Sequence, residues 1–183
     1  DILITTPIAG QKKIQRLITL HQDHPDARFI QVIDDYYHVV EIAKAASAAN
    51  LCVELMIEVE SGQQRCGVQV GDDLVQLIHA IQITDGVSYV GLQAYSGHLQ
   101  HVKGYCLRNE QARSVVVPLF DFIASTLEPQ GMAPQIISGG GTGTYAAYQG
   151  LGYSEIQAGS YLFMDAAYLA IGWLLYPSAA AAE

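Results

Sequence analysis

Basic residues are scarce in this sequence of 183 residues, which has nine Lys and Arg against eighteen Asp and Glu and a formal net charge of -9 at pH 7. A protein that binds nucleic acid needs a basic surface to contact the phosphate backbone, so this balance argues against nucleic acid as a partner. Lys12 and Lys13 are the adjacent basic pair, in a segment that we expect to form a solvated helix face.

Cysteines and long apolar runs are also rare. Cys52, Cys66 and Cys106 form no CxxC pair and no short-range framework, which favours reduced thiols and a cytoplasmic protein. The apolar run from Leu162 to Leu175 is interrupted by Asp165 and is shorter than the roughly 20 residues of a membrane-spanning helix. We therefore expect no membrane partner.

Apolar residues make up 50% of the chain and charged residues 15%, which is typical of a globular domain with a substantial core. Short apolar runs alternate with segments of helical periodicity. Predicted strands cover residues 2–5, 29–33, 51–59, 87–94, 134–137 and 155–158, and predicted helices cover 11–22, 36–49, 72–81 and 110–127, the last bent or split at Pro118.

This alternation predicts right-handed βαβ units and an α/β fold with parallel strands. Six βα units are six-eighths of a TIM-type (β/α)8 barrel, and the alternative is an open, doubly wound sheet. We favour the incomplete barrel, because polar segments follow almost every predicted strand and barrel enzymes often bind phosphate after their last two strands. We expect a barrel domain over residues 1–168 and an apolar, Ala-rich tail over 169–183.

The stretch Ser138-Gly139-Gly140-Gly141-Thr142-Gly143-Thr144 follows one predicted strand and opens a short helical segment near 145–148. Consecutive glycines cost backbone entropy, which suggests a geometric need. Glycine lets backbone N–H groups approach an anion, and a helix start adds unpaired donors. We favour a phosphate site over a flexible turn. Gly159-Ser160-Tyr161, after the last predicted strand, offers further donors, and we expect the two loops to bind one phosphate together.

Arg65 lies at a predicted strand end between Gly62 and Gly67. One interpretation is a fixed cation that contacts a bound anion or a cofactor oxygen. The other is a surface arginine paired with Glu58 or Glu60. The spacing leaves both interpretations open.

Tyr95, His98 and His101 follow the fourth predicted strand. His98-x-x-His101 is half of a metal site, but no third ligand has a convincing spacing, so we predict no metal there. We favour Tyr95 and His98 as stacking or hydrogen-bonding groups at a pocket mouth, over a half-buried tyrosine and an ordinary loop histidine. The segment 99–107 is long enough for part of a lid.

As an ordered set, these motifs resemble the D-threonine aldolase and D-serine dehydratase group of the alanine racemase-like, fold-type III pyridoxal-phosphate enzymes. The resemblance runs from Asp1 to about Tyr168. It departs at Gln64, where the family usually has glycine, and at Ala158, where it usually has proline. The matching segments are residues 1–4, 58–60, 62–67, 91–98, 138–144 and 157–165.

The resemblance implies a barrel that holds pyridoxal 5'-phosphate, with Arg65 on the phenolate oxygen of the ring. Tyr95, Gln93 and His98 would line the ring. The phosphate would be bound by two sets of residues, Gly140, Gly141 and Thr142 from the first loop and Gly159, Ser160 and Tyr161 from the second. Arg65 and His98 are the candidates for a catalytic role.

The resemblance also implies an incomplete chain. The family's Schiff-base lysine would precede Asp1, and its divalent metal ligands, for Zn or Mn, would lie in a C-terminal β domain that follows Tyr168. The lysines present are Lys12, Lys13, Lys44 and Lys103, and none ends a predicted strand.

The expected activity is therefore that of a pyridoxal-phosphate-dependent lyase acting on D-β-hydroxy amino acids, as an aldolase or a dehydratase, carried here by a fragment. The alternative is a non-catalytic, phosphate-binding half-barrel that forms a homo-oligomer or assembles with a complementing chain. An unrelated sugar-phosphate barrel enzyme is the third hypothesis. The substrate would be a small D-amino acid in the first case.

Overall fold

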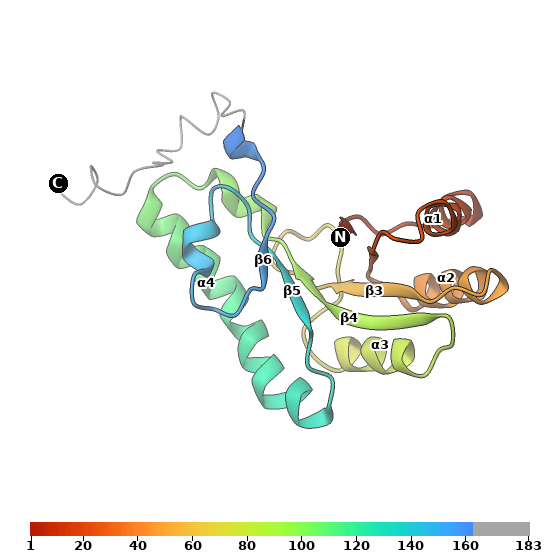
Figure 1. The fold of residues 1–183 in the computed structure, drawn as a ribbon. Coiled ribbons are helices and arrows are strands. Elements are labelled where there is room, and N and C mark those ends of the chain that lie inside the picture. The colour runs from red at the N-terminus through yellow and green to blue at the C-terminus, as the bar shows by residue number, and fades with distance from the viewer. Residues whose placement is uncertain (163–183) are drawn as a thin grey trace.

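The computed structural model describes residues 1–162. They form one parallel sheet of six strands, and the order of the strands in the sheet follows their order in the chain (Figure 1). The strands are β1 (Ile2–Ile4), β2 (Phe29–Ile33), β3 (Val53–Glu58), β4 (Val87–Ala94), β5 (Ile136–Gly139) and β6 (Glu155–Ile156). A doubly wound sheet reverses its strand order at a switch point, so this order confirms the incomplete α/β barrel.

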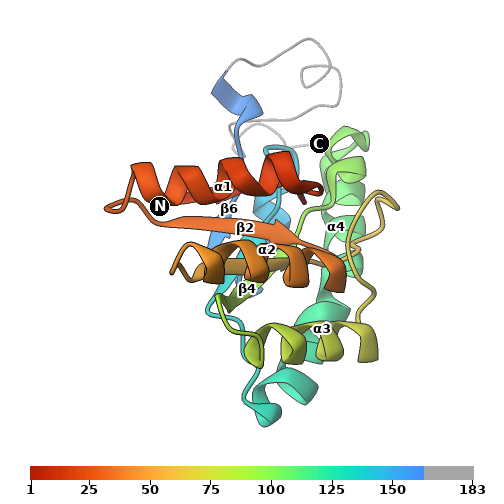
Figure 2. The same ribbon diagram turned by 90° about the vertical axis from the view of Figure 1, so that its right-hand side faces the viewer.

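The four α-helices are α1 (Gln11–Asp23), α2 (Tyr36–Ala48), α3 (Asp72–Gln82) and α4 (Tyr105–Phe122). Helices α1, α2 and α3 lie along one side of the curved sheet, and Figure 2 shows α1 and α2 on either side of β2 in projection. Shorter helical turns are η1 (Gly97–His101), η2 (Ile123–Leu127), η3 (Glu128–Gln130), η4 (Tyr145–Tyr148) and η5 (Ser160–Leu162).

Both faces of the strands are apolar, as expected for parallel strands that are buried on both sides. On the helix side, Leu55 and Ile57 of β3 pack in one cluster with residues from all four α-helices, such as Ile42 of α2. On the opposite face, Val32 and Met56 belong to a smaller cluster. Truncating a fully buried side chain such as Ile42 to alanine would cost about 2–5 kcal/mol.

Close packing between β4 and β5 explains one glycine outside the loops. Gly91 pairs with Ile136, and a Cβ at Gly91 would collide with the Ile136 carbonyl group.

The register of β3 against β4 also shifts between Leu55 and Met56, which is a local irregularity of the ladder.

Helix boundaries agree with the sequence in α1, α2 and α3, and differ in α4. Asp35 caps α2, because its carboxylate accepts the Tyr37 N–H at 2.6 Å. The fourth helix begins at Tyr105 rather than at residue 110, and it continues through Pro118 without a break. Of the expected bend or split at Pro118, the split was wrong: the regular α-helix ends four residues later, where a π-helical turn begins at Ile123.

No helix within residues 1–162 is both long enough and apolar enough to span a bilayer. The expected domain boundary at 168 and the expected tail over 169–183 lie outside the described residues.

Candidate functional site

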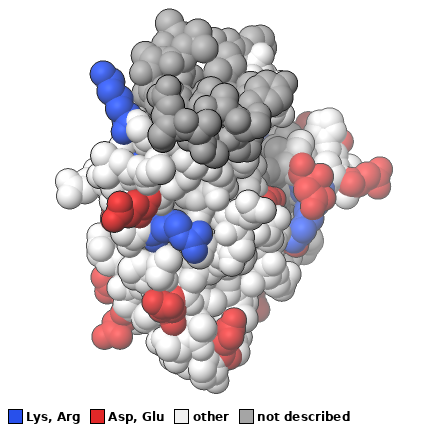
Figure 3. Space-filling model, turned by 90° about the vertical axis from the view of Figure 1, so that its left-hand side faces the viewer, with Lys and Arg blue, Asp and Glu red and all other residues white. Residues whose placement is uncertain are grey.

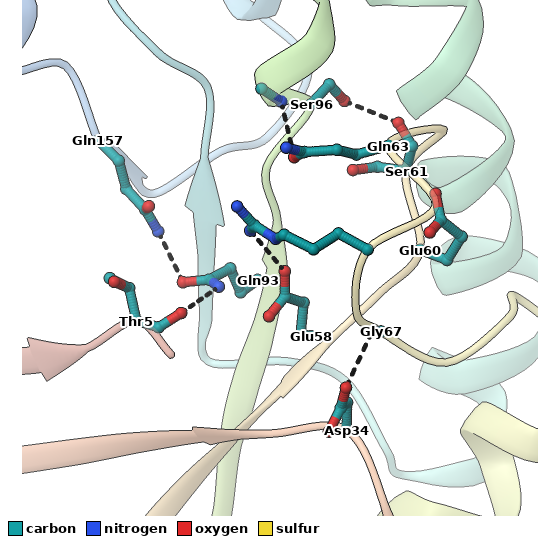
Figure 4. A network of polar contacts seen from close by, with 12 residues as sticks. Thr5, Asp34, Glu58, Glu60, Ser61, Gln63, Gly67, Gln93, Ser96 and Gln157 are labelled. Atoms are coloured by element: carbon teal, nitrogen blue, oxygen red, sulfur yellow. Dashed lines mark hydrogen bonds and ion pairs between the residues drawn. The ribbon is translucent and has the colours of Figure 1, made fainter. Parts of the chain in front are cut away.

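The carboxyl ends of the parallel strands meet at one edge of the sheet, and polar side chains gather there (Figure 4). Thr5 follows β1, Asp34 follows β2, Glu58 ends β3, Gln93 lies near the end of β4, and Gln157 follows β6. Ligands of open and closed α/β sheets bind outside this edge. We therefore build the candidate site from it.

Two glutamine side chains connect four strand ends. Gln93 is 1% exposed and donates from Nε2 to the Thr5 carbonyl oxygen at 3.0 Å. Gln157 donates from Nε2 to Gln93 Oε1 and to Ser138 Oγ, each at 2.9 Å. The amide of Gln93 is thus engaged on both sides. The expected ring-lining residue is held by both bonds. Gln157 and Ser138 lie in segments that the sequence analysis named, but neither side chain was given a role in the site there.

Glu58 and Arg65 form an ion pair with unequal surroundings. Glu58 Oε1 lies 3.4 Å from an Arg65 guanidinium nitrogen, and the Arg65 side chain is 53% exposed. The other carboxylate oxygen, Oε2, is buried and has no hydrogen-bond partner among residues 1–162. Burial raises the pKa of the Glu58 carboxyl, and Arg65 opposes this shift. Arg65 therefore has its expected acidic neighbour and an exposed end at the strand edge, so both interpretations from the sequence are compatible with its position.

The loop that carries Arg65 is held by its neighbours. The N–H of Gly67 donates to Asp34 Oδ2 at 3.1 Å, and the N–H of Gly62 donates to the Glu60 carboxylate. Gly67 has φ +105°, and a Cβ there would lie 2.6 Å from the Glu60 nitrogen, so glycine is required. Gln64 has φ 52°, which is a left-handed conformation that glycine adopts at lower cost.

A second set of contacts joins this loop to the segment after β4. Ser96 Oγ donates to the Ser61 carbonyl oxygen at 3.1 Å, and the N–H of Gly97 donates to Gln63 Oε1 at 3.3 Å. His98 packs on Gly62, where an added Cβ would lie 3.0 Å from the imidazole Cε1. The structure therefore brings the Arg65 loop and the His98 loop together.

Tyr95 is half-buried, whereas His98 and His101 are exposed. Within residues 1–162, no three His, Cys, Asp or Glu side chains are grouped so that they could hold a metal ion. The expected lid segment 99–107 is mostly structured, because it contains part of η1 and the first turn of α4.

The glycines of the loop after β5 have a packing reason that the sequence did not suggest. A Cβ at Gly140 would lie 2.5 Å from the Tyr148 ring, and one at Gly141 would lie 2.6 Å from the Gln100 side chain. A Cβ at Gly143 would lie 2.9 Å from the Gln100 carbonyl oxygen. These glycines make room for protein neighbours, and this reason exists beside any role in anion binding.

Hydrogen bonds within this loop engage some of its amides. The N–H of Gly141 donates to Thr144 Oγ1 at 3.1 Å, and the N–H of Gly143 donates to Gln100 Oε1 at 2.7 Å. The N–H groups of Thr142 and Gly159 have no partner within residues 1–162. Of these two residues Gly159 is exposed and Thr142 is buried, whereas the amides of Gly141 and Gly143 are already hydrogen-bonded within the protein.

The two loops that follow β5 and β6 are in direct contact. The Tyr161 N–H donates to Thr142 Oγ1 at 3.3 Å. Thr142 is 2% exposed, whereas Gly159, Ser160 and Tyr161 are exposed. No atom lies within 4 Å of a Cβ built at Gly159, so the space beside it is open. Amides without a hydrogen-bond partner in residues 1–162 and the open space beside Gly159 fit a phosphorylated ligand such as pyridoxal phosphate.

Three cavities lie beside the helices, and the second of them reaches Asp34 at the strand edge. One of about 460 Å³ lies between α1 and α2, one of about 490 Å³ is lined by the start of α2 and by α3, and one of about 320 Å³ lies under α1. On the face seen in Figure 3, basic side chains are few and do not form a patch. The charge on this face gives no support to a nucleic-acid interface.

Comparison with known proteins places this geometry in a family. The model of the alanine racemase N-terminal domain matches residues 11–167. The 3-hydroxy-D-aspartate aldolase of Paracoccus denitrificans (strain Pd 1222) is 31% identical over 169 residues, with 92% of this chain and 43% of that protein covered. The D-threonine aldolase of an Arthrobacter species is 36% identical over 177 residues, with 94% and 45% covered.

A solved structure is similar over the same part. The crystal structure of D-threonine aldolase from Filomicrobium marinum superposes with a TM-score of 0.82 at 32% identity, and covers 92% of this chain and 45% of that one. The chain thus spans less than half the length of these relatives. The match over residues 11–167 shows that the chain belongs to the alanine racemase N-terminal domain family.

Proposed function

We propose that this chain is the cofactor-binding part of a pyridoxal-phosphate-dependent lyase that acts on D-amino acids with a hydroxyl group on Cβ. The two curated relatives support this proposal, because 3-hydroxy-D-aspartate and D-threonine both carry that hydroxyl. When bound, pyridoxal phosphate supplies an electron sink for the negative charge that develops on the substrate Cα.

The observation that carries the proposal is the contact between the two loops through Thr142 and Tyr161. This contact supports the proposal because the N–H groups of Thr142 and Gly159, which have no partner within residues 1–162, belong to two loops that touch, and converging amides are what a phosphate site uses. In this proposal Gly140, Gly141 and Thr142 bind the phosphate from one loop, and Gly159, Ser160 and Tyr161 bind it from the other. Gly141 contributes by its lack of a side chain and not by its N–H, because that N–H already donates to Thr144.

The remaining residues act on the pyridine ring. The exposed guanidinium of Arg65 donates to the phenolate oxygen, and Glu58 orients Arg65 through their ion pair. Tyr95, Gln93 and His98 line the ring, with Gln93 fixed by Thr5 and Gln157. In this proposal the expected Zn or Mn ion is left to the full-length members of the family, and we assign no metal ligand to this chain.

A specific observation favours a second candidate, which is a non-catalytic half-barrel that binds the phosphate and assembles with another copy or a complementing chain. Lys12 and Lys13 lie on α1, Lys44 lies on α2, and Lys103 lies between η1 and α4. None of the four lysines of the chain stands at the carboxyl end of a strand, where it would meet the ring.

The test of the phosphate site uses Gly159, where the structure has open space for a side chain. Binding of pyridoxal phosphate to the 183-residue chain is measured by calorimetry, with inorganic phosphate as competitor. Gly159→Asp should abolish binding, because its carboxylate repels the phosphate, and the uncharged, equally large Gly159→Asn should bind more tightly than Gly159→Asp. Equal affinities of the two variants, or no binding by the parent chain, would overturn the proposal.

Cleavage of D-threonine by the cofactor-loaded chain separates the two candidates. Turnover by the chain alone supports the lyase and excludes the non-catalytic half-barrel. Binding without turnover supports a chain that needs further polypeptide for catalysis.

A further inference from the structure

A buried arginine is hydrogen-bonded to the loop after β5, residues 140–144, which we call the glycine loop. Arg108 lies in the first turns of α4 and is 0% exposed. Its Nε donates to the Gly143 carbonyl oxygen at 2.7 Å, and its NH1 donates to the Val102 carbonyl oxygen at 2.8 Å. A charged side chain is seldom fully buried unless it is well paired. Burial of Arg108 therefore has a desolvation cost, which its hydrogen bonds offset.

Gln100 holds the same peptide from the other side. It is 2% exposed, its Oε1 accepts the N–H of Gly143, and its Nε2 donates to Thr144 Oγ1 at 2.9 Å. Gly143 is therefore bound at its N–H by Gln100 and at its carbonyl oxygen by Arg108. A loop of glycines has high conformational freedom, and these two contacts remove that freedom next to Thr142.

We infer that Arg108 is a positioning residue of the phosphate site, which fixes the Gly143 peptide and places a buried positive charge behind the loop that receives the anion. This inference rests on the proposed function above. The charge matters because electrostatic attraction is stronger away from water, and a loop that is already ordered loses less entropy when the phosphate binds.

The inference predicts an effect on the phosphate group and not on the ring. Dissociation constants are measured for pyridoxal phosphate and for pyridoxal, which lacks the phosphate. Arg108→Met should weaken binding of pyridoxal phosphate by about tenfold or more, since charge-assisted hydrogen bonds are lost, and leave pyridoxal unchanged. Arg108→Lys keeps the charge without the planar guanidinium group. Its affinity for pyridoxal phosphate should lie between those of the parent chain and of Arg108→Met.

Arg113 provides the matched control. It lies on the same helix and also donates to a carbonyl oxygen, that of Ala147 at 2.8 Å, but it is exposed. Arg113→Met should leave both affinities unchanged. If Arg108→Met does not fold, as judged by circular dichroism, Arg108→Lys and Gln100→Met are compared in the same way.

The possible outcomes separate the two proposals. Equal loss for pyridoxal phosphate and pyridoxal, or no loss at all, overturns the inference about Arg108 while the proposed function stands. A parent chain that binds pyridoxal phosphate no better than pyridoxal overturns the proposed function and this inference together.

Discussion

Thr142 accepts the backbone N–H of Tyr161 on its hydroxyl oxygen, and this bond joins two loops that follow different strands. Thr142 is almost fully buried and Tyr161 is exposed, so the bond is shielded from water on the Thr142 side alone. The short strand β6 adds two residues to the sheet edge, and Tyr161 lies only five residues beyond it. The Thr142 hydroxyl therefore helps to position the second loop relative to the first, together with the bonds from Gln157 to Ser138, Gly139 and Gly140.

Replacing Thr142 should loosen this junction. Thr142→Val removes the acceptor at nearly constant volume and should lower the free energy of unfolding by about 1 kcal/mol, while it weakens binding of pyridoxal phosphate. Thr142→Ser retains the hydroxyl and should keep most of the stability and most of the affinity for pyridoxal phosphate. Urea unfolding and calorimetric titration measure the two effects. Equal behaviour of the Val and Ser variants would contradict the role of the hydroxyl.

Thr144 should be more costly to replace than Thr142. Its hydroxyl is 0% exposed, accepts from the Gly141 N–H and from Gln100 Nε2, and belongs to the glycine loop itself. Thr144→Val leaves two buried donors unpaired and should destabilise the chain by about 2–3 kcal/mol. Urea unfolding of both valine variants gives the comparison, and a smaller loss for Thr144→Val than for Thr142→Val would contradict the bonding described here.

Gln64→Gly should stabilise the chain. A non-glycine residue in the left-handed region costs about 1–2 kcal/mol, and glycine costs roughly 0.5–1 kcal/mol in chain entropy, so the net gain is about 0.5 kcal/mol. Asn50, at φ 55° after α2, is the control, because asparagine tolerates this conformation. Asn50→Gly should have an effect near zero. Denaturation midpoints measure both, and a loss for Gln64→Gly would show that its side chain makes a stabilising contact.

The buried carboxyl of Glu58 should make stability depend on pH. Its pKa is raised above the usual 4.5, so the folded state binds the proton more tightly than the unfolded state does. Its contribution to stability is therefore greatest when protonated and falls as the pH rises from about 4.5 through the folded-state pKa. Glu58→Gln removes this dependence, so its stability relative to the parent should increase between pH 4 and pH 7. Parallel curves of melting temperature against pH would contradict the assignment.

The positions of the four lysines predict the outcome of chemical trapping. Pyridoxal phosphate is added to the chain, the mixture is reduced with borohydride, and modified lysines are mapped by mass spectrometry. We expect no stoichiometric adduct at Lys12, Lys13, Lys44 or Lys103, because none stands at a strand end. Incubation with excess inorganic phosphate is the control for surface labelling. A single adduct at full occupancy with turnover would contradict the prediction.

The sequence predicts the strands well because buried parallel strands are short, continuous apolar runs. The strands at 29–33 and 87–94 have the bounds that the sequence predicts. The start of α4 was placed too late, since Tyr105 and Leu107 in its first turn are exposed and obscure the helical periodicity. The glycine at position 104, directly before the helix, was the signal in the sequence for this boundary, and the structure gives it φ 86°.

The residues of the candidate site also divide into those that the sequence predicts and those that it does not. The polar residues at strand ends can be found from the sequence, because the carboxyl ends of parallel strands share one edge. Gln100, Arg108 and Gln157 could not, since each acts by contact with a residue at least 19 positions away. An arginine on a helix resembles any surface arginine until its partner in space is known. The reason for the glycines was likewise tertiary, because Tyr148 and Gln100 occupy the space that side chains would fill.

The sequential order of the six strands has a consequence for how the chain is made. Every strand pairs with the strand synthesised just before it, so no part of the sheet waits for a distant segment. Each new strand and helix can dock on the completed part during synthesis. The loop after β6 follows all six strands of residues 1–162, so the contact between Thr142 and Tyr161 forms after this sheet has been synthesised.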